Sequence, residues 1–488
     1  MKKNTIVQII LVLLICLVTV STVRKEHTQS DIYFSIAVGD RIEKNGFENT
    51  DKLVWHEGLR YIYLRWGFDV IVNQIYDFWG LDGIQVFIVT ISIFQMLLYY
   101  FILNSITKKK IYSFICTLLI IPQMLFEFVG RAHLISFSLF LIEYYCIEKL
   151  VETNKNKYFI ILMIIPLLLV NFHASTYPLY FLFFLPYIAE FILSKMNLKK
   201  DIFSKIIIEK RNINKLIILI FIGIFCGFCS PSGAEAYKYV FKVMNAISAS
   251  FIVEMQPISI LDDKLIALSI SLFIGIIAFS KTKVRIVDCF LVLGITIMSL
   301  NTNRYTFFFY LIASISVFRL LNDFFKDYEI NFDFIDLKLK RILAIWGILV
   351  IVFASCNKTI SNYVHDYTNT LIYPVNASQY ILNNIDISKM KLYNHFNFGG
   401  YLEFVGIPVF LDARAEMYTK EFNNTSILED WYKVTSGTES YNKIFDKYDI
   451  THALLYNDEN INIYMKEDKN WKIVYQDEIF TLYENVQN

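Results

Sequence analysis

The sequence predicts a polytopic α-helical membrane protein with a small C-terminal α/β domain outside the membrane. Of its 488 residues, 55% are hydrophobic and only 19% are charged, a balance that soluble globular proteins of this size seldom reach. Apolar stretches of about 20 residues, the length that crosses a bilayer, recur up to residue 356. After residue 356, short strand-like runs alternate with helix-like runs. We therefore expect a transmembrane domain, 1–356, and an extracytoplasmic domain, 357–488.

We predict about eleven membrane-spanning helices from these apolar stretches. They lie at 5–23, 84–104, 111–129, 133–150, 158–173, 175–194, 215–230, 264–280, 286–301, 305–322 and 341–356. The stretches near 158 and 215 are the shortest.

The distribution of basic residues predicts the orientation of these helices. Lys2 and Lys3 precede the first span, whose apolar stretch is long and ends without a small-residue cleavage site, so we interpret it as an uncleaved anchor. With a cytoplasmic N-terminus, five successive inner loops are basic, as the positive-inside rule requires. These loops lie at 108–110, 149–157, 195–215, 281–285 and 326–341. An odd number of spans then places the loop 24–83 and the tail 357–488 together outside the cell membrane.

Charge and cysteine content exclude other classes of protein. The net charge is +1 and the lysines form short clusters between apolar stretches, which gives no basic face for a nucleic acid. All seven cysteines lie in or beside apolar stretches, so a disulfide-stapled outer domain is excluded. The sequence also contains no P-loop, dinucleotide fingerprint, HExxH or GxSxG motif.

The first outer loop, 24–83, is too rich in aromatic and charged residues for a spacer. We expect it to fold against the membrane, with Asp31 just outside the first span. Its apolar side chains recur at helical spacing, which predicts an interfacial helix. These side chains are Leu59, Ile62, Tyr63, Trp66 and Val70.

The tail combines strand-like and helix-like runs. The predicted strands are 391–396, 407–411, 452–456, 471–475 and 480–483, and a helix is predicted at 441–448. Asp412 and Arg414 follow the second of these runs. Ligand-binding residues gather beyond the carboxyl ends of strands in open α/β sheets, but Asp412 and Arg414 are equally suited to pair with each other or to cap a helix.

Ionisable and polar residues gather at the predicted outer ends of the spans. Taken singly, such a histidine or arginine is usually structural or a headgroup anchor. Four separate outer junctions carry them, however, and this convergence favours one site built from several loops. The residues are Glu127, Arg131, His133, Asn171, His173, Glu254, Asp262, Asn301, Asn303 and Arg304.

The whole layout resembles the GT-C superfamily of membrane glycosyltransferases, in which a first span precedes a long outer loop with an acidic residue. Locally, DIYFSIAVGDRI (31–42) with WHEGL (55–59), and YNHFNFGGYLEFVGIPVFLDAR (393–414) with YDITHALLY (448–456), look like uncharacterised bacterial relatives of that superfamily. The chain departs from many members in lacking a paired acidic motif near Asp31 and a WWDYG-like motif in the tail.

The resemblance implies transfer of a sugar from a polyprenyl-phosphate donor to a cell-surface glycan or lipid acceptor at the outer face, with inversion. It implies a base for the acceptor hydroxyl, for which Asp31 is the first candidate, Glu57 or His56 the second and Asp40 the third. Arg131 or Arg304 would stabilise the departing phosphate. His133, His173, Glu254, Asp412 and Arg414 complete the expected substrate-binding residues. Carboxylates such as Asp31 and Glu57 suit Mg²⁺ or Mn²⁺, but no spacing requires a metal.

Two other functions stay open. A transporter or flippase of a lipid-linked saccharide should show internal repeats and Gly- or Pro-broken spans, and we find no convincing repeat among only 17 Gly and 8 Pro. A non-catalytic cell-envelope assembly protein is compatible with every feature above. It predicts that Asp31 can be replaced without loss, whereas the enzyme predicts nearly complete loss.

Overall fold

The structure is a computed structural model that describes residues 3–25, 30–196, 204–244, 253–329, 336–363, 368 and 370–486. It divides into two compact units. The helical unit comprises Met1–Arg24, Gln85–Gly233 and Ile252–His365. The mixed unit comprises Lys25–Ile84, Ala234–Phe251 and Asp366–Asn488. The first loop and the tail therefore belong to the same unit.

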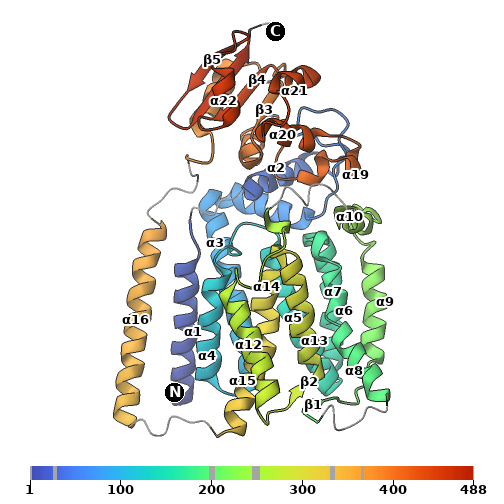
Figure 1. Cartoon of the computed structure of the whole chain (residues 1–488), viewed down its shortest axis with the longest axis vertical. Coiled ribbons are helices and arrows are strands. Elements are labelled where there is room, and N and C mark those ends of the chain that lie inside the picture. Colours follow the sequence, from blue (N-terminus) through green and yellow to red (C-terminus); the bar gives the residue numbers. More distant parts are fainter. Residues whose placement is uncertain are drawn as a thin grey trace. The chain divides into compact units, whose positions relative to one another are not determined.

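The helical unit is a bundle of helices that run roughly side by side (Figure 1). Its helices are α1 (Lys3–Thr22), the second part of α3 (Trp66–Thr107), α4 (Lys110–Ile120), α5 (His133–Thr153), α6 (Asn156–Phe172), α7 (Leu179–Leu182), α8 (Leu185–Lys195), α9 (Asn214–Cys226), α12 (Lys264–Phe279), α13 (Ile286–Asn301), α14 (Thr306–Phe308), α15 (Ser314–Asp327) and α16 (Leu337–Tyr363). Short 3-10 or π segments continue or connect several of them, at Ile121–Met124, Ala174–Thr176, Val253–Met255, Asn303–Tyr305 and Phe309–Ala313. Two short strands, β1 (Ile206–Ile207) and β2 (Val284–Arg285), pair in parallel at one end of the bundle.

Each predicted apolar stretch overlaps a helix of this unit. Five helical segments are long and apolar enough to cross a membrane, and five shorter apolar helices accompany them among the described residues. Together they have the composition of a multi-pass membrane protein. The number of crossings and the side of each terminus stay predictions, and parts of two predicted inner loops, 197–203 and 330–335, lie outside the described residues.

Burial within the bundle separates its core from its outer surface. The apolar window of α16 is only 6% buried, whereas that of the segment Asn303–Asp327 is 78% buried. α16 packs along α1, to which the Asn362 side chain donates a hydrogen bond at the Ser21 carbonyl (2.8 Å). An apolar helix that is exposed on most faces is stable only in an apolar solvent, so α16 has the surface of a lipid-facing helix.

The mixed unit contains a four-stranded sheet with the order β3-β4-β6-β5. Its strands are β3 (Leu392–Asn394), β4 (His452–Tyr456), β5 (Trp471–Gln476) and β6 (Phe480–Asn485), and only the β3–β4 pair is parallel. Its helices are α2 (Ser30–Asn45), the first part of α3, α10 (Glu235–Met244), α17 (Val375–Asn384), α18 (Gly399–Phe404), α19 (Lys420–Asn423), α20 (Ile427–Thr435), α21 (Tyr441–Tyr448) and α22 (Asn460–Met465). α3 bends at Gly80, whose φ of 62° is accessible to glycine without strain.

Two local predictions are wrong. Residues 407–411 are buried except for the half-buried Pro408, but they form no strand, because their backbone groups bond elsewhere: Phe410 N–H donates to the Asn394 side chain (2.8 Å). Residues 59–65 are not helical, although their apolar spacing suggested a helix. Gly58 has a φ of 79°, and the Leu59 carbonyl accepts from Asp51 N–H (2.7 Å), so this segment folds back on the loop and helix α3 begins only at Trp66.

Helix α2 holds the first loop against the tail within the mixed unit. It packs on α18, and the Tyr33 ring contacts Tyr373, Tyr401 and Phe404 with centroid distances of 5.0 to 5.2 Å. On another face, Gly39 lies so close to α3 that an added Cβ would stand 2.7 Å from the Asn73 side chain. These contacts fix the residues at the start of α2 in place.

Candidate functional site

Asp31 lies in the first turn of α2, where the helix dipole favours a negative charge. Its side chain is 19% exposed, and Oδ2 lies 3.6 Å from Nη1 of Arg65. The Arg65 Nε in turn lies 3.4 Å from Oδ1 of Asp69, which is fully buried. Arg65 thus stands between two carboxylates, one buried and one partly open to solvent.

The Phe34 ring joins this pair to a second arginine. The Arg65 guanidinium carbon lies 3.9 Å from the ring centroid of Phe34, and that of Arg414 lies 5.5 Å from the same centroid. Arg414 also lies 5.0 Å from the Tyr61 ring. Cations are attracted to aromatic faces at these distances. Asp31 and Arg414, which are far apart in the sequence, therefore belong to one cluster.

Arg414 is buried and contacts three carboxylates. Its Nε donates to Asp412 Oδ2 (2.8 Å), its Nη2 donates to Glu403 Oε1 (2.6 Å), and its Nη1 donates to Asp51. The Tyr418 hydroxyl also donates to Asp412 Oδ2 (2.9 Å). Asp412 and Arg414 therefore pair with each other, one of the arrangements that the sequence left open.

The carboxylates of this cluster have opposite protonation preferences. Burial alone would raise the pKa of Asp412, but the charge of Arg414 and the hydrogen bonds to it outweigh burial and lower the pKa to about 2. Burial raises the pKa of Glu403 well above its usual range, and the charges of Asp412 and Asp51 act in the same direction against the charge of Arg414. Of the two, Asp412 holds its negative charge more firmly, and Glu403 is the more readily protonated.

A close approach of two segments positions Asp412. The Asn394 side chain, at the end of β3, donates to the Leu411 carbonyl (2.9 Å). Gly399 packs against the same segment, so that an added Cβ would stand 2.8 Å from the Asp412 Cα. Asp412 follows no strand of its own, but the Asn394 side chain holds it beside the end of strand β3.

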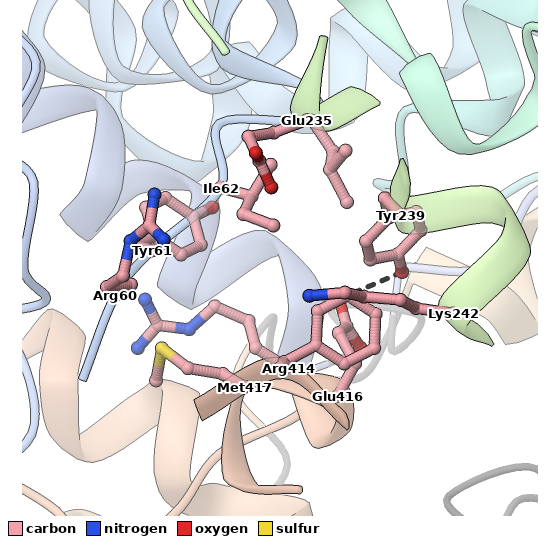
Figure 2. A pocket seen from close by; sticks show the side chains of 11 residues that line it. Arg60, Tyr61, Ile62, Glu235, Tyr239, Lys242, Arg414, Glu416 and Met417 are labelled. Atoms are coloured by element: carbon pink, nitrogen blue, oxygen red, sulfur yellow. Dashed lines mark hydrogen bonds between the residues drawn. The ribbon is translucent and has the colours of Figure 1, made fainter. Parts of the chain in front are cut away.

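A small cavity of about 30 Å³ adjoins this cluster (Figure 2). Three segments of the mixed unit line it, with polar contributions from Arg60, Tyr61, Glu235, Tyr239, Lys242, Arg414 and Glu416. The Tyr239 hydroxyl of α10 donates to Glu416 Oε1 (3.0 Å). A water molecule needs about 10–15 Å³ of such space. This cavity therefore accommodates water or a single ligand oxygen, but not a sugar ring.

The other predicted catalytic residues lie apart from Asp31. Asp40 follows it by nine residues, about two and a half helical turns, and so faces the other way, paired with Lys44 (2.7 Å). Glu57 is exposed. His56 bonds through Nε2 to the Phe410 carbonyl (2.9 Å), and burial lowers its pKa to about 4. Because a carbonyl can only accept, this nitrogen carries the proton and is not available as a base.

The remaining predicted residues lie in the helical unit. Arg131 Nη1 pairs with Glu254 Oε1 (2.8 Å), and His133 Nε2 lies 3.0 Å from the Glu127 carbonyl. The segment with Glu254 contacts the segment with Arg304, because Asn303 N–H donates to the Gln256 carbonyl (2.9 Å). Arg304 itself is exposed. His173 Nδ1 lies 2.8 Å from the Ser136 hydroxyl of α5, three residues after His133.

Asp51, Glu403 and Phe34 were not among the predicted site residues. Asp51 and Arg414 are 363 positions apart, and no local pattern marks such a pair. Glu403 lies only four residues after Gly399, in helix α18, which precedes Asp412 in the chain. An acidic residue inside an otherwise apolar run, which is costly to bury without a partner, was the one available signal.

The cluster around Arg414 is not arranged as a metal site. Asp51, Asp412 and Glu403 converge on the Arg414 guanidinium, which occupies the position that a cation would take among them. Within the described ranges, no group of three or more His, Cys, Asp or Glu side chains could hold a metal ion. Dependence on Mg²⁺ or Mn²⁺ stays a prediction.

No family model and no curated protein matches the sequence. Solved structures do match. The oligosaccharyltransferase of Archaeoglobus fulgidus, tethered to an acceptor peptide with an NVT sequon, aligns with a TM-score of 0.58 and 10% identity over 93% of this chain and 69% of its own. A second structure of that enzyme, with zinc and sulfate, has a TM-score of 0.54 and 10% identity over 91% and 68%.

ArnT from Cupriavidus metallidurans, bound to undecaprenyl phosphate, aligns over 99% of this chain and 98% of its own, with a TM-score of 0.54 and 9% identity. At these low sequence identities, the structural similarity establishes a shared fold and not a shared function. Oligosaccharyltransferase and ArnT are both GT-C glycosyltransferases, so the expectation from the sequence is confirmed: the chain has the fold of GT-C membrane glycosyltransferases.

Proposed function

We propose that this protein is a glycosyltransferase that moves a sugar from a polyprenyl-phosphate carrier to a glycan or lipid acceptor at the outer face of the cell membrane. The observation that carries the proposal is the position of Asp31, held beside Arg65 at the start of α2 in a chain with the GT-C fold. The lipid bound to ArnT and the acceptor peptide bound to the oligosaccharyltransferase support a lipid-linked donor and a separate acceptor.

Asp31 is the proposed general base. The acceptor hydroxyl oxygen attacks the anomeric carbon of the donor while its proton passes to the Asp31 carboxylate. The bond between the anomeric carbon and the phosphate oxygen breaks, and the polyprenyl phosphate leaves with the electron pair. A single displacement of this kind inverts the anomeric centre.

Arg65 is a positioning residue in this proposal. Its guanidinium lies 3.6 Å from Asp31, which favours the ionised form that a base requires. Asp69 and Phe34 fix the guanidinium from two other directions. Asp31 is therefore oriented beside a fixed positive charge before the acceptor arrives, which lowers the cost of reaching the transition state.

The departing phosphate needs cations, and the resemblance to GT-C transferases implies Arg131 or Arg304 for this role. Arg304 is exposed, whereas Arg131 already pairs with Glu254. An arginine without a carboxylate partner contributes its full charge to an incoming anion, and no described carboxylate lies within ion-pair distance of Arg304. We therefore place Arg304 before Arg131 in this role.

The experiment compares lipid-linked and surface glycans in the native host that carries the wild-type protein, Asp31→Asn or Asp40→Asn at matched levels. Asp40 is the matched control because it lies on the same helix, and its salt bridge to Lys44 is exposed and therefore weak. The proposal predicts loss of one glycan species, or accumulation of a lipid-linked sugar, with Asp31→Asn only.

Unchanged glycans with Asp31→Asn would contradict the assignment of the base and favour a non-catalytic assembly protein. A transporter or flippase would instead give a lipid-linked sugar that accumulates on the inner side when the whole protein is absent, with no effect of the single substitution. The three functions thus differ in the outcome of one glycan comparison.

A further inference from the structure

A second, larger cavity lies wholly within the helical unit. It has a volume of about 630 Å³, within the range of about 300–1,000 Å³ that is usual for small-molecule sites. Charged side chains dominate its lining: Lys108, Lys149, Lys210, Arg211, Arg285 and Arg319 are cationic, and Glu148, Glu152, Glu209 and Asp323 are anionic. A cavity of this size and polarity among membrane helices is unsuited to a lipid tail.

A network of buried ion pairs lies at its wall. Arg285 donates through both terminal nitrogens to Glu148 (2.7 and 2.9 Å). Arg319 donates to Glu148 (3.0 Å), to both oxygens of Asp288 (3.1 and 3.2 Å) and to the Tyr144 hydroxyl (3.1 Å). Three helices and a strand supply these residues, so the two guanidiniums are held rigidly in place.

Charged residues inside a predicted membrane domain are expensive to bury and usually mark a functional path or site. This network lies at the end of the unit where the chain begins, because Lys110, two residues after the cavity residue Lys108, donates to the Asn4 carbonyl (3.4 Å). The lysine distribution predicts that end to be cytoplasmic. The proposed transfer at the outer face therefore gives this cavity no role.

Several donors that line the cavity have no acceptor among the residues described. The Nε–H group of Arg285 is buried and makes no hydrogen bond, and Oδ2 of Asp288 lies 3.7 Å from its nitrogen. Arg211, in contrast, is paired, because its Nε lies 3.1 Å from Oε2 of Glu190 and its Nη2 lies 2.8 Å from Oε2 of Glu209. Lys108 and Lys210 are exposed, and within the described ranges no carboxylate lies within ion-pair distance of either. Buried polar groups are almost always satisfied. The Arg285 N–H donor and the two lysines, all in one cavity, indicate that an anionic acceptor is missing.

One buried acceptor in the lining is also unused. Asn322 is only 7% exposed, and its Oδ1 makes no hydrogen bond among the residues described. Because the oxygen and nitrogen of an amide can exchange places by rotation, Asn322 can also offer its N–H₂ group to an anion. The site thus combines fixed guanidiniums, two lysines and an adaptable amide.

We propose that this cavity binds a phosphate group, carried either by a lipid headgroup or by a soluble phosphorylated molecule. Guanidinium forks and lysines are the usual protein partners of phosphate. A metal cation is disfavoured, because Glu148 and Glu152 each pair with an arginine or lysine of the cavity. The inference does not rest on the proposed transferase function.

The test uses the full-length protein in phosphatidylcholine nanodiscs. Calorimetric titration with inorganic phosphate and pyrophosphate probes a soluble source. Native mass spectrometry of the protein with phosphatidylglycerol and phosphatidylcholine probes a lipid source. The variants are Lys108→Gln combined with Lys210→Gln, and Asn322→Asp, which places a negative charge in the cavity. Lys283→Gln, an exposed lysine at the same end that does not line the cavity, is the control.

Binding of phosphate or pyrophosphate that weakens about tenfold or more in both variants, but not in the control, identifies a soluble ligand. Preferential retention of phosphatidylglycerol that is lost in the same variants identifies a headgroup. If the wild type binds none of these probes, or if the variants bind as the control does, the proposal is overturned. The double lysine variant changes only exposed side chains, so its fold should persist, and an unchanged melting temperature verifies this.

Discussion

Replacing Arg414 by methionine should destabilise the mixed unit severely. The change keeps the length and most of the apolar volume of the side chain but removes its charge and all of its hydrogen bonds. Asp51 and Asp412 would then be buried without a cation, since both lose the guanidinium that now contacts them. Breaking a buried ion pair by removing one partner costs about 3–5 kcal/mol. For a unit of this size we expect the melting temperature to fall by roughly 10 °C.

Intrinsic fluorescence of the full chain in detergent is a suitable assay. Five of the six tryptophans belong to the mixed unit, so the signal reports mainly on its unfolding: Trp55, Trp66, Trp79, Trp431 and Trp471. The control is Arg60→Met, which removes an exposed arginine that lines the small cavity.

A second measurement tests the mechanism of this destabilisation. Combining Arg414→Met with Asp412→Asn removes one of the stranded charges, so the pair should cost less than the sum of the two single changes. The reasoning is refuted if Arg414→Met melts within about 2 °C of the wild type, a shift of under about 1 kcal/mol, or if the two substitutions are additive.

In the folded state burial lowers the pKa of His56 to about 4, compared with 6.5 for an unperturbed histidine. The contribution of His56 to the free energy of unfolding is therefore fully present above pH 6.5 and is lost as the pH drops toward 4. This loss amounts to about 2 kcal/mol between pH 7 and 5. His56→Gln should lose this share of the pH dependence of the melting temperature, and an unchanged dependence would contradict it. Glu403→Gln should change the stability little at pH 7, because glutamine imitates the protonated acid, whereas Asp412→Asn should destabilise the protein strongly. The unfolding free energies of the two variants should therefore differ by about 3 kcal/mol or more. Equal effects would show that Glu403 is ionised. Gly399→Ala should lower the melting temperature, because the added Cβ would collide with the backbone of Leu411 and Asp412. The control Gly294→Ala should not, because Gly294 has open space around it. Similar melting temperatures for the two variants would argue against the close approach of Gly399 to that segment.

The sequence predicts the regular elements well wherever local pattern decides them. Each apolar stretch overlaps a helix, and the strand at 452–456 and the helix at 441–448 have the bounds that their residues suggested. Residues 59–65 show the limit of such patterns. The apolar side chains of this segment have helical spacing, but the backbone conformation of Gly58 and the hydrogen bond between Asp51 and Leu59 prevent a helix. Local helix propensity is weak, and tertiary contacts commonly override it.

The candidate site was predictable only in part. Asp31 could be proposed from its place after the first span, and Arg414 from its place after an apolar run. Their neighbours could not, because the contacts of Arg414 with Asp51 and of both arginines with Phe34 join distant segments. The large cavity of the helical unit was equally hidden, since its lining comes from five separated segments of the chain.

The most direct test of the central claim is a transfer assay with the purified full-length protein. A panel of polyprenyl-phosphate sugars is supplied with membrane glycans or lipids of the native host, and released polyprenyl phosphate is measured by mass spectrometry. We expect release with one donor, a loss of about 100-fold or more with Asp31→Asn, and little change with Asp40→Asn. Equal release by the wild type and Asp31→Asn, or no release from any donor, would contradict the account.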